Sequence, residues 1–214
     1  MTRFVHGRRP AAFAAVLVAA LATGCSSSGS PGPSPLPAPL STTVPDGAKL
    51  CGFLGRRNVE RALGRTDETA RGGVHELPRD APPGSLLASC AVAVPGDGAS
   101  DAFHIDVRRV DRTDSDIVRT ARSGVATFTY PRDIGVGFAS RDLYHDAAGR
   151  AYRSVESGLI RGDWTITLGL QLPGRNRDPV ADLVALAQQA IAAMHLPAQP
   201  SRPYPAAVAS ALRG

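Results

Sequence analysis

The chain has 214 residues, 43% of them hydrophobic, and a formal net charge of +5. Three arginines lie before residue 10, and the rest of the chain has 21 basic and 19 acidic residues, a formal charge of +2. A charge this small predicts no nucleic-acid partner. Lys49 is the sole lysine, so the arginine content is typical of a GC-rich genome and says little about phosphate binding.

The N-terminus has the pattern of an export signal. A basic stretch over residues 1–10 precedes twelve small or apolar residues at 11–22. A helix of that length rises about 18 Å, which is short of the roughly 30 Å hydrocarbon core of a bilayer. The pattern therefore favours a signal peptide over a permanent membrane span.

Residues 21–25, Leu-Ala-Thr-Gly-Cys, resemble the lipobox of bacterial lipoproteins. In that family a diacylglycerol is attached to the cysteine thiol, and the signal peptide is removed just before it. The resemblance implies that residues 1–24 are a signal peptide, that cleavage occurs between Gly24 and Cys25, and that Cys25 carries lipid. We therefore expect the membrane as a partner and residence on its extracytoplasmic face. An ordinary secreted protein with a chance cysteine is the alternative.

Residues 25–45 are expected to form a stalk between the lipid and the domain. They are rich in Ser and Gly, and prolines alternate from 31 to 39. Proline fixes φ and lacks an amide proton, so we expect an extended segment of about 3.1 Å per residue. The alternative is a ligand for a proline-recognising partner.

A globular domain is predicted over residues 46–196, with helices and strands alternating along it. Apolar spacing predicts a helix at 54–63 that Gly64 ends, and three prolines favour a loop at 72–84. Alternating patterns predict two strands, at 87–94 and 101–110, that pair as a hairpin.

The second half of the domain contains its clearest patterns. A helix is expected from Asp114 or Ser115 to about 123, followed by weaker strand candidates at 125–130 and 134–139. Residues 151–160 and 164–172 are predicted to form a hairpin around Gly162-Asp163. A helix follows, capped by Asp178 and with Pro179 in its first turn. Residues 197–214 are expected to form a loose tail with a short helix near 206–212.

This order of elements predicts an α+β fold. We expect an antiparallel sheet of about five strands with helices packed mainly on one face. The order is also similar to that of a PsbP/Mog1-type sandwich, a likeness of fold that implies no function.

Two cysteines remain in the domain, Cys51 and Cys90. An even pair in an exported domain favours a disulfide, with two free buried thiols as the alternative. A metal site would need further ligands at suitable spacing, so we expect no metal and no cofactor.

The segments 50–54 and 62–64, together with Ala88-Ser89-Cys90 at the start of a strand, resemble a domain of unknown function in actinobacterial lipoproteins. The resemblance covers about residues 50–194. It implies the disulfide and residence in the cell envelope, and it implies no reaction.

Candidate catalytic groups are scattered along the chain. His104 and Asp106 share the outer face of one predicted strand, with Arg108 beyond them. These side chains could form an acid–base pair or contact a metal, but we favour the interpretation that they lie on a solvated strand face. Tyr144-His145-Asp146 is read as a turn, and Arg161-Gly162-Asp163 as a hairpin turn despite spelling an adhesion tripeptide. Gly135-Val136-Gly137 lacks the third glycine of a dinucleotide loop, and Trp164 is expected in the core.

These patterns favour a non-enzymatic module of the cell envelope. Its expected partner is a protein, a wall polymer or a small apolar ligand, bound on the sheet face that the helices leave open or between sheet and helix. An unrecognised hydrolase and a structural subunit of a membrane complex are the alternatives.

Overall fold

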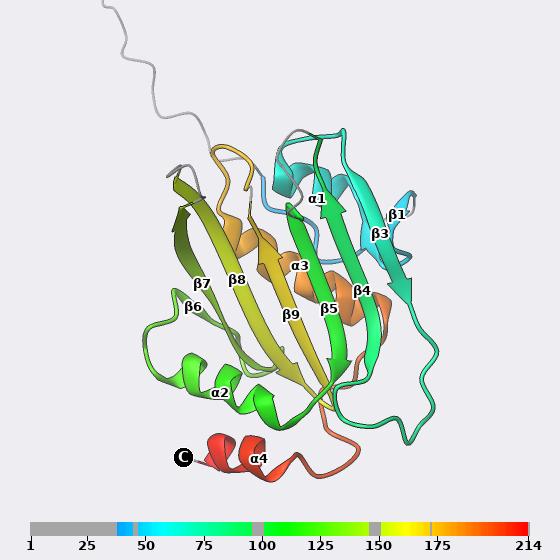
Figure 1. Ribbon diagram of the computed structural model, residues 1–214, viewed down its shortest axis with the longest axis vertical. Helices are drawn as coiled ribbons and strands as arrows, with labels where there is room; N and C mark the ends of the chain where they lie inside the picture. Colours follow the sequence, from blue (N-terminus) through cyan, green and yellow to red (C-terminus); the bar gives the residue numbers. More distant parts are fainter. Residues whose placement is uncertain (1–37, 45–46, 96–100, 146–150, 172, 214) are drawn as a thin grey trace, which may run out of the picture. The chain divides into compact units, whose positions relative to one another are not determined.

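A seven-stranded antiparallel sheet is the framework of the domain in the computed structural model (Figure 1). The structure describes residues 38–44, 47–95, 101–145, 151–171 and 173–213, and for 142–145 and 151–153 only the backbone. In spatial order the strands are β3 (Thr69–Val74), β4 (Leu86–Ala93), β5 (Phe103–Arg109), β9 (Trp164–Leu170), β8 (Ala151–Arg161), β7 (Val136–His145) and β6 (Phe128–Thr129). The described residues belong to one compact unit, in which β1 (Lys49–Leu50) and β2 (Leu54–Gly55) form a separate ribbon.

Helices cover both faces of the sheet. Behind it in Figure 1 lie α1 (Arg56–Leu63) and α3 (Pro179–Ala193). The front face carries α2 (Ser115–Arg122), which follows a short 3₁₀ turn and packs on β7 and β8, and α4 (Ala206–Arg213), which packs on α2. The helices were predicted mainly on one face, whereas α3 and α2 lie on opposite faces of the sheet and α4 packs on α2.

The main core lies between the two central strands and α3. Phe103, Ile105 and Val107 of β5 stand directly opposite Leu170, Leu168 and Ile166 of β9, and none of these six side chains is more than 2% exposed. Leu183 and Leu186 of α3 close the layer from the other side. Burial of each such side chain contributes roughly 1.5–3 kcal/mol, which explains why their period-2 pattern fixes the register of this pair.

Two predicted helix boundaries agree with the structure, whereas the helix predicted from residue 54 begins at Arg56 because Leu54–Gly55 pair with β1 as β2. The carboxylate of Asp178 accepts hydrogen bonds from the backbone amides of Val180 and Ala181 at the start of α3. Gly64 follows α1 in the left-handed conformation, with φ of 67°. Both predicted boundaries are confirmed, because each rests on a local requirement that few residue types meet.

The sheet is larger than predicted, with seven strands where we expected about five. Most of β3 falls in a stretch without apolar alternation that was partly read as loop. It is an edge strand paired only with β4, and five of its six residues are exposed, so neither face imposes a hydrophobic pattern. The weak candidates at 125–130 and 134–139 become β6 and the much longer β7.

Residues 38–44 were assigned to the stalk, and they pack on the domain instead. Leu40 is 6% exposed within the main core. The carbonyl oxygen of Ala38 accepts hydrogen bonds from Arg61 and Arg177, and that of Ser41 accepts one from Nε2 of Gln189 on α3. Residues 38–44 are thus held beside α1 and α3.

The C-terminal segment, predicted as a loose tail, is also packed. Val208 of α4 is fully buried in a second apolar cluster with Val118 of α2 and Ile160 of β8. Two carbonyl groups at the end of α4 accept hydrogen bonds from Arg122. The predicted short helix is confirmed. Its apolar face packs on α2 and β8, a contact that the proline-rich sequence before the helix did not indicate.

Candidate ligand-binding pocket

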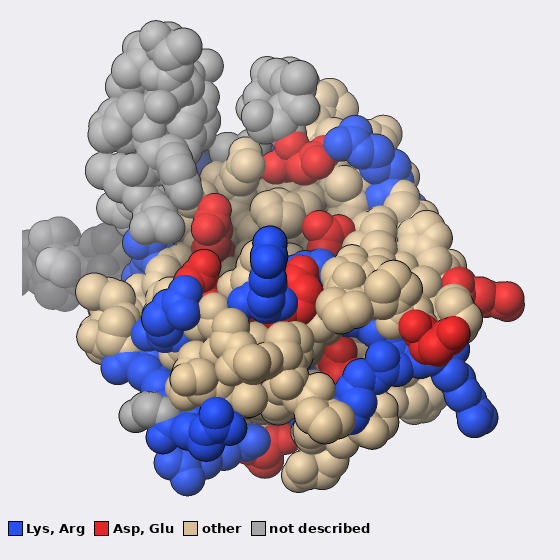
Figure 2. All heavy atoms as spheres, turned by 60° about the horizontal axis from the view of Figure 1, so that its bottom comes forward, with Lys and Arg blue, Asp and Glu red and all other residues tan. Residues whose placement is uncertain are grey.

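A pocket of about 310 Å³ lies at the end of the sheet where β5 ends and β9 begins. Its walls come from the turn between β8 and β9, from the end of β5, from the loop before β4 and from the segment that leads into α4. The lining residues are Pro83, Arg109, Val110, Asp163, Arg202, Pro203, Tyr204 and Pro205. Figure 2 turns this end of the domain toward the viewer, with basic and acidic side chains interspersed around it.

Arg109 is the most deeply placed cation of the pocket. Its side chain is 10% exposed and stacks on Trp164, with 5.0 Å from the guanidinium carbon to the ring centroid. Its Nη2 donates to the carbonyl oxygen of Arg79 at 3.0 Å. Its Nε is buried and has no hydrogen-bond partner among the described residues. A buried charged group with an unused donor costs free energy, so Arg109 is incompletely satisfied by the domain itself.

Asp163 is the acidic residue of the pocket, and its carboxylate is occupied mainly by Ser201. The backbone amide of Ser201 donates to Oδ1 at 2.9 Å, and its hydroxyl donates to Oδ2. The nearest nitrogen of Arg109 is 3.9 Å away, at the limit of an ion pair. Asp163 therefore neutralises the Arg109 charge only in part.

Arg202 and Tyr204 bring two further donors to the opening. Nη2 of Arg202 donates to the same Arg79 carbonyl oxygen, at 2.6 Å, so the two guanidinium groups meet around one atom. Burial and the charge of Asp163 both raise the pKa of Tyr204 above its usual value. Its phenol therefore stays protonated near neutral pH and can donate a hydrogen bond.

The adhesion-like tripeptide is fixed within this end of the domain. A side chain at Gly162, where φ is 54°, would come within 2.4 Å of the carbonyl oxygen of Pro197. Arg161 donates to the carbonyl oxygens of Asp133, Ile134 and Leu196. Arg161 and Asp163 are thus bound within the domain, and the reading as a hairpin turn is confirmed.

The row His104–Asp106–Arg108 lies on the front face of the sheet, as predicted, and its members have different surroundings. The His104 ring lies over Gly169 on the neighbouring strand. Arg108 forms ion pairs with Asp111 at 2.8 Å and with Asp114 at 2.6 Å. Asp114 is 1% exposed and also accepts from Thr165, so Arg108 belongs to a partly buried network that joins β5 and β9 to the 3₁₀ turn before α2.

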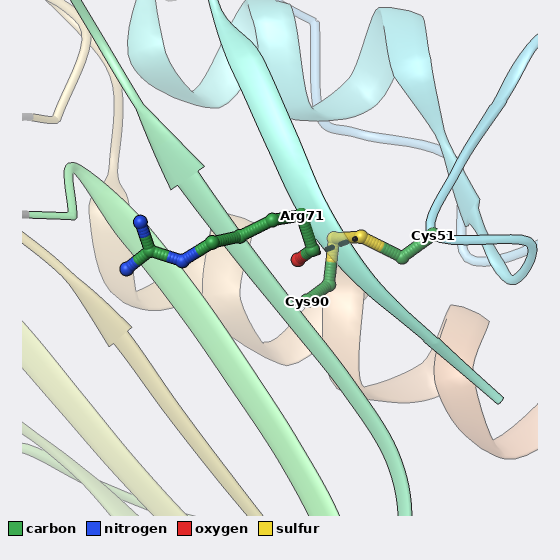
Figure 3. Close-up of a disulfide and its surroundings, with 3 residues drawn as sticks. All are labelled: Cys51, Arg71 and Cys90. Carbon is green, nitrogen blue, oxygen red and sulfur yellow. Dashed lines mark hydrogen bonds between the residues drawn. A yellow bond between two sulfur atoms is a disulfide. The ribbon is translucent and has the colours of Figure 1, made fainter. Parts of the chain in front are cut away.

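The two domain cysteines form a disulfide, as predicted. Cys51 lies in the turn between β1 and β2 and Cys90 lies on β4, with 5.6 Å between their Cα atoms. Figure 3 shows the bond beside β3, where the Sγ of Cys51 is 3.4 Å from the carbonyl oxygen of Arg71. The bond ties the β1–β2 ribbon to β4, the strand next to the sheet edge.

Several predicted sites lie outside what the structure describes. Gly24, Cys25 and Asp146 are among them, and so are the side chains of Tyr144 and His145. The backbone of Tyr144 and His145 forms the end of β7 and pairs with β8, so the prediction of a loop or turn is wrong for these two residues. Trp164 is partly buried against the core, as expected. Within the described ranges, no three His, Cys, Asp or Glu side chains are grouped to hold a metal ion, and no helix has the length and apolarity to span a bilayer.

The pocket residues were missed by the sequence analysis. Arg109 did leave a signal, because it occupies the inward-facing position that continues Phe103, Ile105 and Val107 along β5. A charged residue at the end of an apolar row is unusual and points to a special environment. Arg202 and Tyr204 gave no signal, since they lie in a segment whose composition resembles a tail.

Comparisons with protein-family models, with curated proteins and with solved structures find no match to this chain. The function is therefore inferred from the residues and their geometry.

Proposed function

We propose that the chain is a lipid-anchored binding protein on the extracytoplasmic face of a membrane, held through lipid on Cys25 and acting without catalysis. The lipobox-like segment at 21–25 supports the anchor. Because the chain would lose its three N-terminal arginines on cleavage, the mature protein would be nearly neutral, and attachment would depend on acyl chains rather than on charge.

The position of the pocket relative to the attachment point carries the proposal. The chain enters the domain at Ala38, which is held by Arg177 just beyond the end of β9. The pocket lies at the start of β9, beside Trp164. β9 has seven residues, which corresponds to a strand length of roughly 20 Å between its two ends. A domain tethered at one end would present this pocket away from the membrane.

The environment of His104, Asp106 and Arg108, for which an acid–base pair was the less favoured interpretation, supports binding over catalysis. Arg108 is committed to Asp111 and Asp114, and His104 packs on Gly169. An unrecognised hydrolase and a structural subunit of a membrane complex remain the alternatives.

Two finer assignments belong to the same proposal. The first is a PsbP/Mog1-type sandwich, which the layering of α3 on an antiparallel sheet supports. The second is membership of the actinobacterial lipoprotein domain family, which the placement of Cys51 and Cys90 supports.

The anchor is tested by replacing Cys25 with Ala and fractionating cells that express the full chain. We expect the parent protein in the membrane fraction, resistant to high salt and released by detergent. The Cys25→Ala variant should leave that fraction. Ser26→Ala, one residue further on, is the matched control and should behave like the parent.

Retention of the Cys25→Ala variant in a detergent-dependent membrane fraction would refute the lipid anchor. Binding is tested separately, by pull-down from detergent-solubilised envelope together with native mass spectrometry of the purified protein. A stoichiometric partner without any bound small molecule would favour the structural-subunit alternative.

A further inference from the structure

The polar groups of the pocket are unbalanced toward positive charge. Of the eight lining residues, Arg109 and Arg202 are basic and Asp163 is acidic. Asp163 accepts two hydrogen bonds from Ser201. Two guanidinium groups therefore converge on one carbonyl oxygen with only partial compensation, an arrangement that an anion would stabilise.

The available donors match a carboxylate. Arg109 and Arg202 both line the cavity, and burial together with the charge of Asp163 raises the pKa of Tyr204, so its phenol is protonated near neutral pH. A carboxylate has two oxygens that can accept several hydrogen bonds in one plane, which suits a guanidinium edge beside a hydroxyl.

The rest of the pocket is apolar and small. Pro83, Pro203, Pro205 and Val110 contribute the apolar part of its lining. A volume of about 310 Å³ is at the lower limit of small-molecule sites, which span roughly 300–1,000 Å³. The cavity therefore suits a compact apolar body attached to the charged group.

We propose that this pocket binds a carboxylate on a compact apolar body, either a free organic acid or the C-terminal end of a peptide. The inference rests on the proposed binding function and adds the chemical class of the ligand. It does not depend on the lipid anchor.

Trp164 provides the assay, since it is the one tryptophan of the chain and stacks on Arg109. The full-length protein, purified in detergent, is titrated with cyclohexanecarboxylate, which does not absorb at the excitation wavelength. We expect a saturable change in tryptophan fluorescence with a Kd of about 1 mM or below. Cyclohexanecarboxamide, of the same shape without charge, is the control and should give no saturable change.

Matched variants locate the binding site. Arg202→Gln should weaken binding of the carboxylate about tenfold, because it removes a charge-assisted hydrogen bond. Arg79→Gln is the control, since only the backbone carbonyl of Arg79 takes part in the pocket, and it should change the affinity less than about twofold. Tyr204→Phe tests the third donor and should weaken binding about fivefold.

Equal responses to the carboxylate and the carboxamide would overturn the proposal, as would no saturation up to about 20 mM. Equal losses in Arg202→Gln and Arg79→Gln would overturn the assignment to this pocket. N-acetyl-alanyl-alanine and its C-terminal amide distinguish a peptide C-terminus from a free organic acid as the ligand. Tighter binding of the peptide acid than of cyclohexanecarboxylate would identify a peptide C-terminus. Tighter binding of cyclohexanecarboxylate would identify a small organic acid. Membrane fractionation and pull-down report on the broader function independently, so either proposal can fail alone.

Discussion

Removing the Cys51–Cys90 disulfide should lower the free energy of unfolding of the domain by an amount set by the length of the loop that the disulfide closes. The two cysteines are 39 residues apart, and closing a loop of that length in the unfolded chain corresponds to about 4 kcal/mol in the chain-entropy model. Cys51 is the better position to change because its side chain is only partly buried. Cys90 is 1% exposed, so its truncation would add a packing loss.

The assay compares thermal unfolding of the parent protein and Cys51→Ala, each with and without a reductant. For a domain of this size, about 4 kcal/mol corresponds to a fall in Tm of roughly 8–16 °C. The reduced parent and the oxidised variant should unfold at similar temperatures, because both lack the cross-link.

The control is the effect of reductant on Cys51→Ala, which should be negligible. If the oxidised parent, the reduced parent and the variant all unfold within about 2 °C of one another, the loop-entropy reasoning is refuted. A large effect of reductant on the variant would show instead that the reductant acts elsewhere.

Two further predictions concern single side chains in the sheet. Burial raises the pKa of Tyr130 to about 12 despite a hydrogen bond with Ser157, so the phenol contributes stability that is complete below pH 10 and lost between about pH 10 and 12. Tyr130→Phe should reduce the alkaline fall in the urea midpoint over that range, and an unchanged fall would contradict this. At Gly169 a Cβ would lie 2.2 Å from the ring of His104, so Gly169→Ala should cost about 1 kcal/mol in the parent and nothing in His104→Ala. Additive effects in this urea-unfolding cycle would contradict the contact.

The predictable parts of the fold are those in which burial on one face imposes a period. β9 alternates because its apolar residues face α3, and α3 begins at Asp178 because its carboxylate satisfies two free amides. The turn at Gly162 was predictable for a similar reason, since its φ of 54° favours glycine. Each of these features depends on residues close together in the chain.

The missed parts depend on partners that are distant in sequence. β3 was missed because an exposed edge strand needs no apolar face. The segment at 197–205 was read as a tail because proline prevents regular structure, yet proline does not prevent packing. Ser201 joins Asp163 across 38 positions, and no local pattern reports such a contact. The pocket was unpredictable for this reason, since four of its lining residues lie in that segment.

The neighbouring residues Arg108 and Arg109 provide an internal comparison for the pocket. Both lie at the end of β5 and point to opposite faces of the sheet. Arg108 donates to two carboxylates at 2.6 and 2.8 Å, as a purely structural arginine should. Arg109 is more deeply buried, yet its nearest carboxylate oxygen is 3.9 Å away and its Nε has no partner in the described part of the chain.

This difference separates a structural role from a binding role. A buried guanidinium without full compensation is costly, and its position would be expected to acquire either a closer carboxylate or an apolar residue if stability alone decided its identity. The chain had an acid within reach, because Asp163 lies at the same end of β9, but that acid is held by Ser201. The incomplete pairing of Arg109 is therefore the property of this domain that most directly points to an anionic ligand.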